Sequence, residues 1–266
     1  MKFQQVMAFF LTGATALSMS TTALAADLPD NVDITVSTTQ TADEQENNLY
    51  TKNDKDLEVM LVSPKNGNAL YVENSWFTPA VRYVIENNIM LPAGHIDGKE
   101  YFPWFNPAEN RCTVAEAIYN SAKLVDPKLT ASYAGMAVKE APDYAEIPEL
   151  YRDGASFCFE SGIMTGDSQH YLRPYDSVSR QEFAAVLQRY ITLLQKAGKI
   201  TVSTDTSVNT AFTDASSIAP WAKDAVAFCQ TNKLMNGDNH GAFNPKGQIK
   251  SVELAQVLYN LSQQIK

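Results

Sequence analysis

The chain has 266 residues, of which 45% are hydrophobic and 19% charged, a composition typical of a folded globular protein. Its formal net charge at pH 7 is −9. An acidic protein without a basic stripe repels phosphate backbones, so the composition argues against nucleic-acid binding.

The first 25 residues have the features of a secretory signal peptide. Lys2 provides a positive region, an apolar run extends to Met19, and Ala23-Leu24-Ala25 forms a small-x-small cleavage site. This run is too short to span a bilayer, and no later apolar stretch is long enough. We therefore expect an exported protein without a membrane span, whose loss of Lys2 lowers the charge from −9 to −10.

Residues 26–70 are rich in Asp, Asn, Thr and Gln and predict an acidic polar spacer. Within it, residues 32–36 and 57–62 favour short strands, whereas the segment between them is polar and poorly patterned.

Three apolar pairs recur along the rest of the chain at steps of 74 and 71 residues: Ile89-Met90, Ile163-Met164 and Leu234-Met235. Thirteen residues before each pair stands a large apolar residue, which is Trp76, Leu150 or Trp221. Further apolar residues follow each of them at helical spacing, so an amphipathic helix is predicted at the start of every copy.

A turn-rich loop follows each pair, with Gly166-Asp167 and Gly237-Asp238 at the same place in the second and third copies. The loop of the first copy carries seven extra residues, within the aromatic and exposed insertion from Gly94 to Trp104. The predicted second helix of each copy then begins at a glutamate-containing cap: Thr113 to Glu116, Ser179 to Glu182, and Lys250 to Glu253. The last of these lacks the capping hydroxyl.

A Trp-led helix, a Gly-Asp loop, an aromatic-x-Pro element and a Thr-Arg-Ala-Glu-like helix start, all tripled, resemble the S-layer homology family. The resemblance covers about residues 71 to 266. It implies a mainly all-α fold of three tandem helical-hairpin repeats, at 71–126, 143–197 and 210–266, behind a poorly structured N-terminal spacer. In the family such repeats form one pseudo-threefold unit around a central three-helix bundle.

The family anchors exported bacterial proteins to the cell envelope. Its members bind secondary cell-wall polysaccharide, often pyruvylated, in grooves between neighbouring repeats. The resemblance therefore implies a secreted, non-enzymatic protein of the cell wall or surface layer. Its expected partner is cell-wall polysaccharide, with peptidoglycan or another surface-layer protein as further possibilities.

Arg180 is the first candidate for a ligand-binding residue, because the family uses the arginine of this motif and its donor fork suits a carboxylate. In this alignment Val114 and Ser251 occupy the same place in the other copies. Arg111 and Lys250 lie close enough in sequence to substitute. We expect Arg180→Ala to weaken polymer binding with little change in thermal stability.

The aromatic candidates are Trp76, Trp221 and Trp104. A Trp that heads an amphipathic stripe is more often packed in the core than used as a ligand platform, so packing is favoured for Trp76 and Trp221. Trp104 is the better candidate for an exposed, sugar-stacking ring. Backbone amides of Gly166-Asp167 and Gly237-Asp238 could contact a ligand, or the glycines could satisfy turns that need positive φ.

No cofactor and no metal are expected. The three histidines, His95, His170 and His240, fall in separate loops. Cys112, Cys158 and Cys229 are an odd number and favour buried hydrophobic positions, although a Cys158–Cys229 disulfide remains open.

Two other functions compete with anchoring. One is a structural or protein-partner-binding surface-layer component with little polymer affinity, suggested by the missing arginines. The other is a small envelope hydrolase, against which stand the missing nucleophile elbow and metal-ligand spacing.

Overall fold

The computed structural model describes residues 50–52, 58–62, 69–73, 76–90, 94–96, 99–101, 109–133, 138, 141–205 and 212–266. The chain divides into two compact units, which meet between Asn106 and Pro107. The predicted signal peptide, most of the predicted spacer and Trp104 lie outside the described residues.

The N-terminal unit contains a five-stranded sheet in the order β1-β2-β3-β5-β4. Its strands are β1 (Tyr50–Lys52), β2 (Glu58–Val62), β3 (Ala69–Glu73), β4 (Gly94–Ile96) and β5 (Lys99–Tyr101). Neighbouring strands are antiparallel except β3 and β5, which are parallel. Helix α2 (Thr78–Glu86) lies between β3 and β4 in the chain, and such a crossover is what a parallel pair requires.

This sheet differs from the expectation at two places. The strand expected over 57–62 is confirmed as β2, but β1 and β3 also fall inside or at the end of the segment taken as a spacer. The insertion from Gly94 to Trp104 contains β4 and β5. Each of these short strands gains its hydrogen bonds from partners distant in sequence, which local patterning does not reveal.

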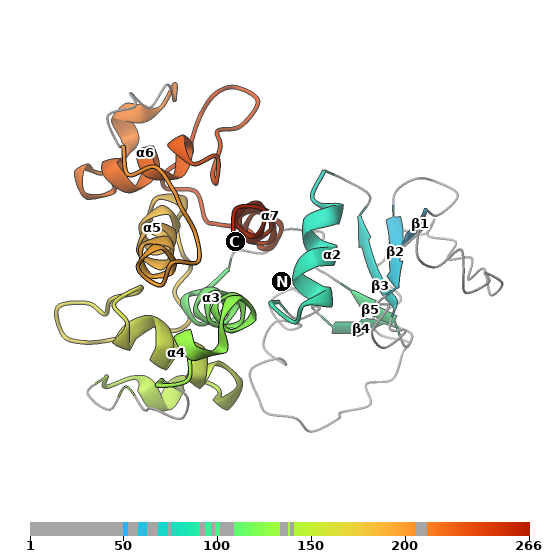
Figure 1. Cartoon of the computed structure of the whole chain (residues 1–266), viewed down its shortest axis with the longest axis horizontal. Helices are drawn as coiled ribbons and strands as arrows, with labels where there is room; N and C mark the ends of the chain where they lie inside the picture. Colours follow the sequence, from blue (N-terminus) through green and yellow to red (C-terminus); the bar gives the residue numbers. More distant parts are fainter. Residues whose placement is uncertain are drawn as a thin grey trace, which may run out of the picture. The chain divides into compact units, whose positions relative to one another are not determined.

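The C-terminal unit is helical, which confirms the mainly all-α fold class. It contains α3 (Arg111–Val125), α4 (Glu149–Glu160), α5 (Arg180–Lys196), α6 (Lys223–Thr231) and α7 (Ser251–Ser262). Short 3-10 turns stand at Pro127–Leu129, Tyr144–Glu146, Ala215–Ser217 and Pro220–Ala222. Figure 1 shows α3, α5 and α7 end on beside one another, with α4 and α6 outside them.

The closest helix pairs are α3 with α4 and α5 with α6. At equivalent places in these pairs, the Cys158 thiol lies 3.5 Å from the Ala115 carbonyl and the Cys229 thiol 3.7 Å from the Ala184 carbonyl. The first helix of one sequence repeat thus packs against the second helix of the preceding repeat. The sequence repeats and the packing units are offset from each other.

A closed cycle of backbone hydrogen bonds joins the segments that lead into α3, α5 and α7. The Glu109 amide donates to Ile249, the Ile249 amide to Val178, and the Val178 amide to Glu109, at 2.9, 2.8 and 3.0 Å. Further along, the buried Tyr190 hydroxyl of α5 bonds to Ser121 of α3 at 3.0 Å. Since α2 belongs to the other unit, the pseudo-threefold arrangement of three hairpins stays a prediction.

All three cysteines are buried and free, so the possible Cys158–Cys229 disulfide is not formed. Burial raises the pKa of the Cys112 thiol to about 12 and those of the other two above the usual thiol range. These side chains therefore pack as small hydrophobic groups. In the described part of the chain, no helix combines the length and apolar character needed to cross a bilayer.

Candidate ligand-binding site

Arg180 is the first residue of α5, and its position is set by a capping box. The Ser179 hydroxyl accepts from the Glu182 amide while the Glu182 carboxylate accepts from the Ser179 amide, so the predicted cap is confirmed. The guanidinium reaches the loop before α7, where Nε donates to Phe243 O at 2.8 Å and Nη2 to Asn236 O at 2.9 Å.

The third nitrogen of Arg180 is also engaged. Nη1 forms a 2.5 Å ion pair with Glu253, and the side chain is only 11% exposed. The guanidinium carbon lies 5.0 Å from the centre of the Phe243 ring. We call this set, Arg180, Asn236, Phe243 and Glu253, the Arg180 junction; it holds the arginine as an internal strut between two loops.

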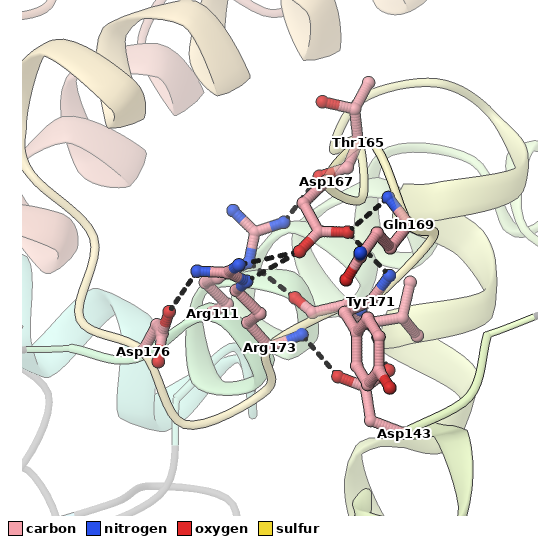
Figure 2. Close-up of polar contacts among 9 residues, drawn as sticks. Arg111, Asp143, Thr165, Asp167, Gln169, Tyr171, Arg173 and Asp176 are labelled. Carbon is pink, nitrogen blue, oxygen red and sulfur yellow. Dashed lines mark hydrogen bonds and ion pairs between the residues drawn. The ribbon is translucent and has the colours of Figure 1, made fainter.

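Arg111 begins α3 and has the same kind of neighbours, as Figure 2 shows. Its Nε donates to Leu172 O at 2.7 Å and its Nη2 to Thr165 O at 2.6 Å. Leu172 and Thr165 each lie 71 residues before the two carbonyls that Arg180 contacts. We call the set of Arg111, Thr165, Asp167 and Leu172 the Arg111 junction.

The alignment that put Val114 in the place of Arg180 is therefore wrong. The cap of α3 is Asn110, whose side chain accepts from the Thr113 amide, and Arg111 follows it as Arg180 follows Ser179. Val114 is fully buried, and Ser251, which begins α7, is 2% exposed. The missed signal was Asn110 three residues before Thr113, itself a capping pair.

Glu116 is consequently not a helix-cap acid, unlike Glu182 and Glu253. It lies where α3 meets α4, with Oε1 accepting from Asn120 at 3.0 Å and Oε2 buried without a hydrogen-bond partner. Burial raises the pKa of this carboxyl to about 7, an effect that the Asn120 hydrogen bond partly opposes.

The Gly-Asp loops are closed by their aspartates. Asp167 Oδ1 accepts from the amides of Gln169 and Tyr171, and Asp238 Oδ1 accepts from those of His240 and Ala242. Amide hydrogen bonds lower the pKa of both carboxyls, for Asp167 together with the Arg173 side chain.

Gly166 and Gly237 do not have the positive φ that was one of their two explanations. Left-handed backbone is found instead at His170 and Gly241. A Cβ at Gly166 would come within 3.1 Å of Tyr171 O, and one at Gly237 within 3.0 Å of Ala242 O. These glycines are required because a backbone carbonyl approaches closely.

Two aspartates that sequence reasoning missed shape the same loops. Both oxygens of Asp143 accept backbone amides, from Leu172 at 2.9 Å and Arg173 at 2.7 Å. Asp214 accepts those of Phe243 and Asn244 in the same way, each at 2.8 Å. A signal was present, because both aspartates precede the apolar residue that heads their copy by seven positions.

The residues that head the three copies are exposed, so the expectation that the tryptophans pack in the core is wrong. Trp76 is 64%, Leu150 56% and Trp221 59% exposed. Each precedes the buried stripe of its helix at a point where no neighbouring element covers it. Lys250, the N-cap residue of α7, is also exposed and forms no hydrogen bond through its side-chain nitrogen within the described residues.

The two junctions differ in electrostatics. Burial lowers the pKa of the Arg111 guanidinium, as does the charge of Arg173, while the charges of Glu182, Asp176 and Asp143 oppose the shift. No ion pair within 4.0 Å joins Arg111 to Glu182 in the described part of the chain, although Glu182 occupies the place that Glu253 has beside Arg180. Arg111 therefore keeps hydrogen-bond donors that Arg180 has used.

Residues 211–250 match the family model described as S-layer homology domain. The chain carries an S-layer homology domain. This segment includes α6, Trp221, Gly237, Asp238 and Lys250. The domain is a non-catalytic module that attaches proteins to the cell wall, so the chain belongs to the cell surface. The three-repeat organisation stays a prediction.

Three curated relatives share part of this sequence. They are an amylopullulanase of Thermoanaerobacterium thermosulfurigenes (29% identical over 113 residues, 42% of this chain and 6% of the relative), exoglucanase XynX of Acetivibrio thermocellus (29% over 113 residues, 42% and 10%) and an endoglucanase of Bacillus sp. strain KSM-635 (28% over 103 residues, 39% and 10%). The match to the S-layer homology protein chain described here therefore spans a tenth or less of each relative.

Proposed function

We propose that this chain is a secreted, non-enzymatic anchoring module that binds an anionic, pyruvylated secondary cell-wall polysaccharide. The proposed repeats are 71–126, 143–197 and 210–266, behind a signal peptide and a spacer. Binding would take place where one repeat meets the next, at the Arg111 and Arg180 junctions.

The observation that carries this proposal is the matching placement of Arg111 and Arg180. Each guanidinium is held by two backbone carbonyls of the following loop, at distances between 2.6 and 2.9 Å. An arginine fixed in this way loses little side-chain entropy on binding a ligand. Its remaining N–H groups suit the planar carboxylate of a ketal-linked pyruvate.

Exposed aromatic rings support a carbohydrate ligand. Trp221 lies within the matched S-layer homology segment, and Tyr171 and Tyr175 of the preceding copy are 40% and 43% exposed. Aromatic faces bury the apolar side of a sugar ring, while hydroxyl groups of the sugar stay in water. A polymer crossing both junctions could use both kinds of contact.

The relatives support anchoring over catalysis. All three are enzymes by name, yet the matched segment covers only 6–10% of each. A shared segment of that size in two glucanases and an amylopullulanase is better explained as a common attachment module than as a common active site. We infer that this chain shares the attachment role.

The test is a pull-down of the mature chain with purified cell-wall sacculi, before and after removal of the non-peptidoglycan polysaccharide. We expect saturable binding that disappears with the polysaccharide. Binding that persists on stripped sacculi would assign the ligand to peptidoglycan. No binding to either preparation would favour a protein partner, and release of soluble sugars would favour a hydrolase.

A further inference from the structure

The Arg111 and Arg180 junctions differ at one loop position that has the same backbone in both. Arg173 has φ 52° and Asn244 has φ 55°, and the amide of each donates to the equivalent aspartate. Asn244 lies 71 residues after Arg173, so the two positions correspond. The second copy therefore adds a cation where the third copy has a neutral amide.

Arg173 points toward Arg111. Its Nε and Nη2 donate to Asp167 Oδ2 at 2.9 and 2.7 Å, and Nη1 lies 3.8 Å from Asp176. Figure 2 shows the guanidinium groups of Arg111 and Arg173 on either side of the Asp167 carboxylate. The Arg173 side chain is 58% exposed, so ligands from solvent can reach it.

The two junctions also differ in the donors that remain available. Arg111 Nη1 has no hydrogen-bond partner among the residues that the structure describes, whereas Arg180 Nη1 is paired with Glu253. Guanidinium carries five N–H donors, so Arg111 and Arg173 together retain several for one incoming anion.

Resting on the function proposed above, we propose that Arg173 is a specificity-determining residue: together with Arg111 it binds a carboxylate of the wall polysaccharide. The Arg111 junction would then select acidic sugar residues. The Arg180 junction, which has Asn244 and an internally paired arginine, would depend much less on ligand charge.

The exchange of Arg173 from Asp167 to a ligand is energetically feasible. An exposed ion pair contributes little to stability, so breaking this one costs little. Asp167 would remain hydrogen-bonded to the amides of Gln169 and Tyr171, at 2.8 and 3.1 Å. A carboxylate bound by two guanidinium groups gains charge-assisted hydrogen bonds at both.

The experiment compares two reciprocal variants, Arg173→Asn and Asn244→Arg, in the full mature chain. Each introduces the residue that the other copy tolerates at the same left-handed backbone, and Asn is favourable there. Lys223→Ala is the control, because Lys223 is exposed, removes one positive charge and lies outside both junctions. Affinity is measured on sacculi that retain their polysaccharide, with native or chemically reduced carboxyl groups.

We expect Arg173→Asn to weaken binding about five- to tenfold on native sacculi, which corresponds to the loss of one charge-assisted contact. Asn244→Arg should strengthen it, and both effects should vanish on carboxyl-reduced sacculi. Wild-type affinity of Arg173→Asn, or a loss that survives carboxyl reduction, would overturn this inference alone. Absence of wild-type binding would overturn the proposed function and this inference together.

Discussion

The Arg111 and Arg180 junctions have the same backbone contacts but different partners for the guanidinium. Arg180 pairs with Glu253 and is almost enclosed, whereas Arg111 retains a free nitrogen and has the exposed Arg173 beside it. Equivalent arginines can therefore differ in role. The comparison indicates that Arg180 contributes more to stability and Arg111 more to recognition.

The largest effect is expected from Arg180→Ala, which should reduce the free energy of unfolding by about 3 kcal/mol. The change removes three hydrogen bonds and leaves Glu253 without its counter-ion. Arg111→Ala should cost about 1–2 kcal/mol, since it removes two hydrogen bonds to carbonyls. This revises our sequence-based expectation of little stability change at Arg180.

Urea denaturation of the mature chain measures both losses, with Lys223→Ala as the matched removal of one positive charge. The control should stay within about 0.5 kcal/mol of the wild type. Equal losses for the two arginine variants would contradict the structural difference between the junctions.

The helix pairs beneath the junctions can be compared through Gly154→Ala. A Cβ at Gly154 would lie 2.7 Å from Glu116 Cα and 2.8 Å from Glu116 N, so α3 and α4 would have to separate. We expect a loss of about 2 kcal/mol in the same denaturation experiment. The corresponding residue of α6 is Ala225, so the α5–α6 pair already accommodates that methyl group. Unchanged stability would show that α4 can shift freely.

Glu116 should make stability depend on pH. Its pKa rises from an ordinary 4.5 to about 7 in the folded chain, so folding favours the protonated acid. The stabilisation is complete below pH 4.5 and is lost as the pH rises through 7, about 2 kcal/mol in all. The groups facing it include Asp153, Lys123 and Asn120.

Glu116→Gln should flatten this part of the stability profile, because the amide does not ionise. The measurement is thermal denaturation at several pH values between 4.5 and 8. Ala185 occupies the equivalent position on α5, so no matching dependence is expected from that pair. A profile identical to that of the wild type would exclude Glu116 as its source.

The smallest effect on stability is expected from Trp221→Ala, below about 0.5 kcal/mol, because the ring is 59% exposed. Binding to polysaccharide-bearing sacculi should nevertheless fall if the ring contacts sugar. Leu150→Ala is the matched change in the preceding copy, and it should leave binding nearly unchanged. A similar loss in both variants would remove the special role of the indole.

Local patterns predicted the features that depend on neighbouring residues. The capping box at Ser179 and Glu182 and the buried pairs Ile163-Met164 and Leu234-Met235 are confirmed. The cap of α3 was misplaced by three residues, because Asn110 and Thr113 are both good N-cap residues. Only the contacts of Arg111 with the next loop distinguish between them.

The exposure of Trp76 and Trp221 could not be predicted from periodicity. Helical spacing identifies which residues share a face, but it does not show where the covering neighbour ends. Both tryptophans precede the covered part of that face. The arginine pairings were beyond reach for a similar reason, since Arg180 and Glu253 are 73 residues apart.

The sequence alone determined the repeated helices, their loops and the S-layer homology character, because these depend on spacing and on side chains a few residues apart. Tertiary structure decided that α3 pairs with α4, that Arg180 is internally neutralised and that Arg173 converges on Arg111. Those outcomes depend on how distant segments meet in space. The free energy of each contact then depends on burial and on neighbouring charges, which a linear pattern does not contain.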